Sequence, residues 1–211
     1  MNINEKNNVL LIGGYKSAGK TSLADMLIAS LKVEGITVNK LSFATPFKRL
    51  LVDGGILTQS QVTGTQDEKN IPSKVQAKSL FKELREKYQW YDDYYLSARE
   101  IMQILGNDIL KVLSPTIWVD YAINTIKKSP GYDLHIIDDY RFGGVEDQMP
   151  FKMGSIYIED INLIKKDNHS SENSLNASQV DLVIHTDKTK RDNLTTNTAI
   201  AREYINKTFG L

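Results

Sequence analysis

Short apolar runs and apolar stripes with helical spacing alternate along most of the chain. Five runs are bounded by turn residues and are too short for helices, which predicts buried strands. These strands span residues 8–13, 38–43, 134–137, 154–159 and 181–185. Between them, apolar residues recur at helical spacing, as do Leu23, Leu27 and Leu31 before Gly35. Because alternating strands and helices pair in parallel through right-handed crossovers, the pattern predicts a three-layer α/β fold with a five-stranded parallel sheet.

This alternation breaks in a polar stretch that contains Gly54-Gly55, Gly64 and Pro72. One helix is expected there, over residues 73–87. An aromatic cluster follows, made up of Tyr88, Trp90, Tyr91, Tyr94 and Tyr95. Aromatic faces can stack a base, but packing of the segment onto the rest of the protein, or a subunit interface, is the favoured interpretation. We therefore expect a helical insertion at residues 54–96.

The stretch GYKSAGKTS, residues 14–22, has the spacing of a phosphate-binding P-loop and follows a predicted strand, as that motif requires. Gly14 and Gly19 permit backbone angles at which successive amides turn toward one anion. Lys20 is expected to contact the β- and γ-phosphates of ATP, and the Thr21 hydroxyl a magnesium ion. The N-terminus of the following helix adds partial positive charge. The predicted phosphate-binding residues are Gly14, Ser17, Ala18, Gly19, Lys20, Thr21 and Ser22.

A second group of candidate residues lies in a helix predicted from Ser97 to Val112. Ser97 and Glu100 form a capping box, which gives Glu100 a structural role. The expected apolar stripe consists of Ile101, Leu105, Ile109 and Val112. The opposite face carries Arg99, Gln103 and Gly106. This combination suits a planar, hydrogen-bonding ligand with an anionic end, and an ordinary solvated face is the alternative.

Charged residues directly follow the strand predicted at 134–137, in the order Asp138-Asp139-Tyr140-Arg141. Ligands of α/β sheets bind at the carboxyl ends of the strands, where the P-loop also opens. A carboxylate there can hold magnesium or its waters, and Arg141 can bind a phosphate; a structural ion pair is the alternative. Lys48 and Arg49 begin another predicted helix, where they indicate either a second phosphate or a solvated face.

Composition narrows the classes of partner and of chemistry. Lys plus Arg and Asp plus Glu number 26 each, so no basic field favours duplex nucleic acid. The absence of cysteine excludes disulfides and thiolate zinc sites, and the three histidines have no metal-ligand spacing. The first apolar run is too short for a signal or membrane segment. We expect one cytoplasmic domain over residues 1–211, with a lid-like loop at the polar residues 160–179.

Five stretches stand in the order found in bacteriophage deoxynucleoside monophosphate kinases. They are SAREIMQILGND, IWVDYAINTI, GYDLHIIDDYRF, NHSSENSL and DLVIHTD. The chain resembles this family over most of residues 9–195, apart from the insertion. The resemblance implies the P-loop kinase fold, ATP and Mg²⁺ as cofactors, a deoxynucleoside monophosphate as the other substrate, and a homodimer.

The same resemblance implies roles for individual residues. Asp139 and Arg141 match the family's Asp-x-Arg, in which Asp139 assists magnesium and Arg141 the transferred phosphoryl group; Lys20 completes the predicted catalytic set. The deoxynucleotide pocket is implied to contain Arg99, Glu100, Gln103, Gly106, Asn107, Trp118 and Arg141, to which we add Lys48. His169 and Glu172 match a His-x-x-Glu stretch near the lid.

The chain departs from the family pattern at four places. Lys20-Thr21-Ser22 stand where family members often have Lys-Asp-Thr, and Lys111 stands where an Arg is common. Glu159-Asp160 stand where the family has an Arg, so Lys165 or Lys166 would have to supply the cation of the lid. Gly143-Gly144 break the usual continuation after Arg-Phe.

The leading hypothesis is ATP-dependent phosphorylation of deoxynucleoside monophosphates. One alternative keeps the kinase and changes its acceptor to a ribonucleotide, dephospho-coenzyme A or a polynucleotide end. The other is a non-catalytic, nucleotide-dependent binding module.

Overall fold

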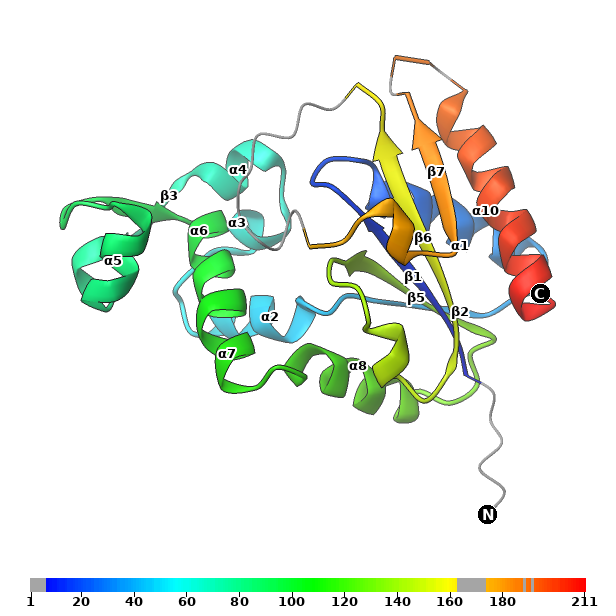
Figure 1. Ribbon diagram of the computed structural model, residues 1–211, viewed down its shortest axis with the longest axis horizontal. Helices are drawn as coiled ribbons and strands as arrows, with labels where there is room; N and C mark the ends of the chain where they lie inside the picture. The colour runs from blue at the N-terminus through cyan, green and yellow to red at the C-terminus, as the bar shows by residue number, and fades with distance from the viewer. Residues whose placement is uncertain (1–6, 163–173, 188, 191) are drawn as a thin grey trace. The chain divides into compact units, whose positions relative to one another are not determined.

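The computed structural model describes residues 7–162, 174–187, 189, 190 and 192–211. The chain divides into two compact units (Figure 1). One comprises residues 1–43 and 116–211 and contains the large sheet; we call it the sheet unit. The other comprises residues 44–115 and is mostly helical; we call it the helical unit.

The sheet unit contains five strands, every neighbouring pair of which is parallel, in the order β2-β5-β1-β6-β7. The strands are β1 (Asn8–Gly14), β2 (Val38–Leu41), β5 (Leu134–Tyr140), β6 (Lys152–Asp160) and β7 (Leu182–Thr186). Its helices are α1 (Lys20–Val33), α8 (Ile117–Lys127) and α10 (Asn193–Phe209), with 3₁₀ turns η3 (Glu146–Gln148) and η4 (Ala177–Gln179). The predicted α/β fold with a five-stranded parallel sheet is confirmed.

The central strand β1 is buried on both faces because its residues are apolar without alternation. Along β1, Leu10 and Ile12 pack in one cluster with side chains of α1 and α10. Val9 and Leu11 point the other way and pack with side chains of α8, including Val119. The sheet therefore lies between two helical layers, with α1 and α10 on one face and α8 on the other (Figure 1).

The helical unit contains six short α-helices, a π-helix and a two-stranded antiparallel sheet. The α-helices are α2 (Thr45–Asp53), α3 (Gln59–Thr63), α4 (Gln66–Asn70), α5 (Lys82–Tyr88) and α6 (Ala98–Gln103), followed by the π-helix (Ile104–Leu110) and the last turn α7 (Lys111–Leu113). The small sheet pairs β3 (Pro72–Gln76) with β4 (Tyr95–Ser97), and η1 (Ala77–Ser79) is a 3₁₀ turn. No helix among the described residues is long and apolar enough to cross a membrane.

The helix predicted over residues 73–87 is wrong in its first half. Residues Pro72–Gln76 form β3, and the helix begins only at Lys82. β3 pairs with β4, some twenty residues later in the chain. Because this pairing is made by tertiary contacts, helical spacing in the sequence could not show it.

The helix predicted from Ser97 to Val112 begins as expected and then changes period. Ser97 caps α6 and forms the predicted capping box with Glu100. The π-helix from Ile104 onward shifts the helical phase, so Ile104 is buried and Val112, expected in the apolar stripe, is 73 % exposed. A prediction made at 100° per residue fails beyond this point.

Candidate active site

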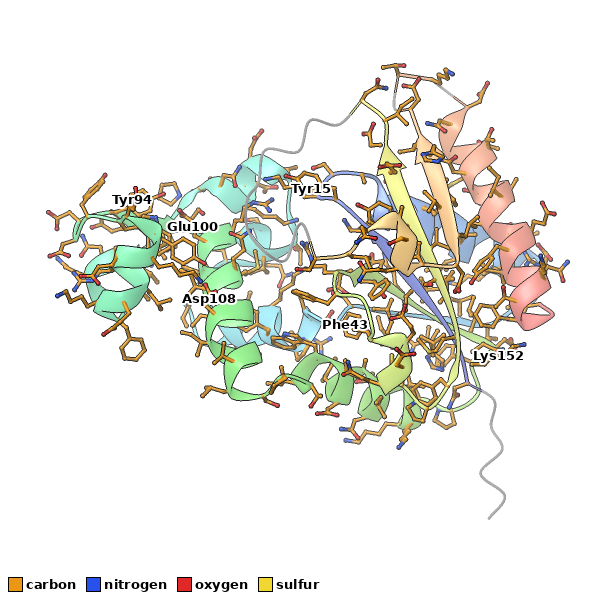
Figure 2. The ribbon with its side chains drawn as sticks, in the orientation of Figure 1. Tyr15, Phe43, Tyr94, Glu100, Asp108 and Lys152 are labelled. Atoms are coloured by element: carbon orange, nitrogen blue, oxygen red, sulfur yellow. The ribbon has the colours of Figure 1, made fainter. Side chains whose placement is uncertain are left out.

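The turn between β1 and α1 has the backbone conformation that a P-loop requires. Gly14, Ser17 and Gly19 all have positive φ, at 142°, 62° and 100°. A Cβ on Gly14 would lie 2.5 Å from the carbonyl oxygen of Ile158 on the neighbouring strand β6, so only glycine fits there. Tyr15, labelled in Figure 2, lies within this turn and is buried. The chain thus forms a compact loop directly before a helix N-terminus, which is a favourable place for an anion.

Lys20 lies against this loop. Its ammonium donates hydrogen bonds to the carbonyl oxygens of Gly14, at 2.8 Å, and Tyr15, at 2.9 Å. The N-cap residue of α1 is Gly19, which provides no side-chain cap. The positive end of the helix and the Lys20 ammonium therefore lie at the same loop.

The end of β5 is aligned with the start of the loop, since Tyr140 is the register partner of Gly13. Asp138, two residues earlier, is 8 % exposed, and the side chain of Thr21 on α1 is near enough to act on the pKa of its carboxyl group. Burial raises the pKa of Asp138, as does the charge of Asp139, while Lys40 and Thr21 oppose the rise. The carboxylate next to the P-loop threonine is thus that of Asp138.

Asp139 makes different contacts. Its carboxylate accepts hydrogen bonds from the Ser42 hydroxyl at 2.6 Å and the backbone amide of Phe43 at 2.7 Å. Both residues follow β2, so Asp139 fixes the chain as it leaves that strand. The resemblance assigned the magnesium role to Asp139, whereas Asp138 is the aspartate beside Thr21. Strand alternation was the available signal, because Asp138 shares the parity of Ile136, which points toward α1.

Arg141 directly follows β5 and therefore lies on the same edge of the sheet as the loop. Gly143 and Gly144, which follow Phe142, are each explained by a different structural feature. A Cβ on Gly143 would lie 2.3 Å from Nε2 of Gln179, and Gly144 has φ of 80°. Gly143-Gly144, where the chain departs from the family pattern, therefore form a tight turn. Trp118, on α8, is half-buried against the apolar cluster on that face.

The remaining predicted pocket residues belong to the helical unit. On α6, Arg99 donates through Nε to Oδ1 of Asn70 at 3.3 Å. Glu100 accepts hydrogen bonds from the backbone amide and hydroxyl of Ser97 at 2.7 and 2.8 Å, and from the hydroxyl of Tyr94 at 3.0 Å. Figure 2 shows Tyr94 and Glu100 close together. The capping box and Tyr94 thus engage the Glu100 carboxylate.

The surroundings of Gln103 and Gly106 differ from those of Glu100. The Nε2 atom of Gln103 is buried and has no hydrogen-bond partner among the described residues. Gly106 is buried, and a Cβ there would lie 3.9 Å from Cε1 of Phe47 on α2. Lys48, on α2, is half-buried. The side chain of Asn107 lies outside the described part of the structure.

The rings of the aromatic cluster contact one another and neighbouring acidic residues. Trp90 stacks between Tyr88, at 4.7 Å between ring centroids, and Tyr94, at 5.8 Å. The hydroxyls of Tyr88 and Tyr94 donate to Asp108 and Glu100, and Figure 2 labels both acids. Burial, with the hydrogen bond to Glu100, raises the pKa of Tyr94 to about 12. The rings thereby attach residues 88–94 to α6 and the π-helix.

The predicted lid falls largely on residues that the structure does not describe. Lys165, Lys166, His169 and Glu172 lie outside the described residues. On either side of them, β6 ends at Asp160 and η4 begins at Ala177.

Comparison with known proteins gives one family. The family model for deoxynucleotide monophosphate kinase matches residues 54–196, which is most of the chain. No curated protein matches it. The match includes α6, the π-helix and the whole of β5 but begins after the P-loop, so the two lines of evidence are independent. The chain belongs to the deoxynucleotide monophosphate kinase family.

Proposed function

We propose that the protein transfers the γ-phosphoryl group of ATP to the phosphate of a deoxynucleoside monophosphate. A phosphate oxygen of the acceptor bonds to the γ-phosphorus, the bond from that phosphorus to the β,γ-bridging oxygen breaks, and ADP leaves. The observation that carries the proposal is the turn between β1 and α1, where Gly14 and Gly19 have positive φ and the Lys20 ammonium lies against the loop carbonyls, in a chain of a kinase family. The family supports the kinase activity in general, and the loop supports ATP as the donor.

The P-loop residues have separate roles in this proposal. The amides of residues 17–21 bind the β- and γ-phosphates, and Lys20 exchanges its two carbonyl contacts for phosphate oxygens. Arg141, on the same edge of the sheet, stabilises negative charge on the transferred group. Phosphoryl transfer needs alignment and charge stabilisation more than it needs a base, and these groups supply both.

Thr21 and Asp138 fit a magnesium ion. A hydroxyl and a buried carboxylate that lie near each other offer two hard oxygen ligands, which is typical of magnesium sites completed by water and phosphate. Magnesium bound there neutralises charge on the β- and γ-phosphates. We assign to Asp138 the role that the sequence analysis predicted for Asp139, because Asp139 binds Ser42 and Phe43.

The acceptor site is proposed to involve α6 and the π-helix. Gln103 supports this assignment, because a buried amide nitrogen without a partner in the described part is costly unless a ligand satisfies it. Arg99 is proposed to bind the acceptor phosphate. Glu100 is proposed to fix the start of α6, since three hydrogen bonds already reach its carboxylate.

The decisive experiment measures ADP release with a panel of acceptors. The panel contains the four common deoxynucleoside monophosphates, the matching ribonucleotides, dephospho-coenzyme A and a 5′-hydroxyl oligonucleotide. We expect at least one deoxynucleotide to accelerate ADP release well beyond the rate without acceptor. Acceleration by another acceptor alone would leave a kinase with a different substrate, and ATP binding without any acceleration would indicate a binding module.

Three statements remain predictions. They are the homodimer, the cytoplasmic location, and the single domain with an insertion at 54–96 and a lid at 160–179. Light scattering coupled to size-exclusion chromatography measures the first directly. A mass equal to one chain, 23.8 kDa, at micromolar concentration would contradict the homodimer.

A further inference from the structure

Lys40, on strand β2, lies between two carboxylates. Its ammonium is 2.6 Å from Oδ1 of Asp25 on α1 and 3.3 Å from Oδ2 of Asp138 on β5. The side chain of Asp138 is 10 % exposed and that of Asp25 is 61 % exposed. The ammonium therefore links a solvated acid to the buried acid near Thr21.

The position of Lys40 follows from strand register. Lys40 pairs with Ile136, and Asp138 lies two residues farther along the same strand. Because side chains alternate between the faces of a sheet, both point toward α1, which carries Asp25 and Thr21. Four polar residues from three elements thus meet at one corner of an otherwise apolar layer.

Lys40 contributes a positive charge between the carboxylates of Asp25 and Asp138. Burial disfavours the ammonium, but the hydrogen bond to Asp25 and the charge of Asp138 outweigh it, so the pKa of Lys40 lies above its usual value. Asp138 has a second acid, Asp139, as its sequence neighbour, whose charge acts against its own. Lys40 is the cation that compensates the Asp138 carboxylate in this environment.

The same ammonium opposes a second cation at Asp138. A divalent ion bound to this carboxylate and to Thr21 would lie close to the Lys40 ammonium, and the two positive charges would repel each other. The phosphates of a nucleotide at the P-loop would add several negative charges at the same place, and these offset the repulsion.

We propose that Lys40 is the resident counter-ion of Asp138: it neutralises this carboxylate while no nucleotide is bound, and it makes divalent-cation binding at Asp138 depend on the phosphates that arrive with the nucleotide. The inference depends on the proposed function for the identity of the cation and of the nucleotide. It makes Lys40 a positioning residue, since it acts through Asp138.

The test is a titration of nucleotide-free protein with Mn²⁺, a substitute for Mg²⁺ whose unbound form is measured by electron paramagnetic resonance. Replacement of Lys40 by Met removes the charge and keeps much of the side-chain volume. We expect Lys40→Met to bind one Mn²⁺ at least about tenfold more tightly than the natural protein. Lys40→Arg keeps the charge and should bind Mn²⁺ as weakly as the natural protein does.

Two further variants locate the effect. Lys32→Met removes an exposed lysine from the last turn of α1 and should leave Mn²⁺ affinity unchanged, which controls for the loss of any positive charge. Adding Asp138→Asn to Lys40→Met should abolish the gain, since the ion then loses its buried ligand. With added ADP, the natural protein and Lys40→Met should bind Mn²⁺ with affinities closer to each other than without nucleotide.

Two results would overturn the inference. One is a folded Lys40→Met variant that binds Mn²⁺ no more tightly than the natural protein; the other is a gain that survives Asp138→Asn. If Lys40→Met does not fold by circular dichroism, Lys40→Gln takes its place under the same expectations. The titration contains no acceptor, so it measures the effect of Lys40 on Mn²⁺ affinity even if no deoxynucleotide proves to be a substrate.

Discussion

The loop at the N-terminus of α1 and the segment from Tyr88 to Asp108 both combine charged groups with special backbone conformations. At the loop, positive φ angles at Gly14 and Gly19 shape the turn, and the Lys20 ammonium contacts backbone carbonyls of that turn. In the second segment, the Glu100 and Asp108 carboxylates accept hydrogen bonds from tyrosines of the same unit. The first region is a turn at a helix N-terminus with a lysine against it, which is a favourable place for an anion, whereas the acids of the second region bind tyrosines of their own unit.

We infer from this comparison that charged side chains whose hydrogen bonds stabilise the local fold are weaker candidates for a ligand site. Asp138 and Asp139 show this on the scale of two residues. Asp139 binds the chain after β2, while Asp138 contacts Thr21 and Lys40. Substitutions can test whether this division between structural and chemical roles is correct.

Lys20→Ala should have the largest effect. We expect turnover to fall by about a thousandfold or more, because the ammonium stabilises charge on the transferred group. The free energy of unfolding should change by less than about 1 kcal/mol, since two partly exposed hydrogen bonds are lost. The measurements are ADP release with the preferred acceptor and urea denaturation.

The matched control is Lys32→Ala, which removes an exposed lysine of the same helix and should retain full turnover. Turnover of Lys20→Ala within tenfold of the natural protein would show that the loop does not bind the transferred phosphoryl group.

The next largest effects should differ between substitutions of the two adjacent aspartates. Asp138→Asn should lower turnover by about a hundredfold at fixed Mg²⁺ with the fold retained, because the proposed ligand loses its charge. Asp139→Asn should instead lower the free energy of unfolding by about 1–3 kcal/mol, since it weakens hydrogen bonds to Ser42 and Phe43. Steady-state kinetics and urea denaturation of both variants give the answer. The reverse pattern would return the magnesium role to Asp139.

These aspartates also show how far the sequence was informative. The strands, the turn between β1 and α1 and the Ser97 capping box follow from local rules, so they were predictable and the structure contains them. The choice between Asp138 and Asp139 depends on which elements face each side of β5, and the partners Lys40 and Ser42 lie nearly a hundred residues away in sequence.

In the helical unit, the features that could not be predicted come from tertiary contacts. β3 forms because β4 pairs with it, and the π-helix shifts the phase that a regular helix would keep. Stacking of Trp90 between two tyrosines likewise brings together rings from both ends of a turn. Helical spacing alone does not contain this information.

Trp90→Ala should have a moderate effect, and it tests the helical unit. Loss of a half-buried ring and of two stacking contacts should lower the free energy of unfolding by about 2 kcal/mol. The KM for the acceptor should stay within twofold, because the ring faces are covered by Tyr88 and Tyr94. Tyr91→Ala, at a ring that is 69 % exposed, should cost less stability and is the matched control. A tenfold rise in KM with little loss of stability would favour base stacking.

The smallest expected effect concerns pH and the buried His135 of β5. This residue is 0 % exposed, its Nε2 has no hydrogen-bond partner in the described part, and burial lowers its pKa below the usual 6.5. The unfolded chain binds a proton below about pH 6.5 while the folded protein resists it, so the stabilisation is complete above that pH and is lost as the pH falls. From pH 6.5 to 5.5 the free energy of unfolding should fall by about 1 kcal/mol, and in His135→Asn by much less. Urea denaturation at the two pH values measures both slopes; equal slopes would mean that His135 takes up its proton in the folded sheet as readily as in the unfolded chain.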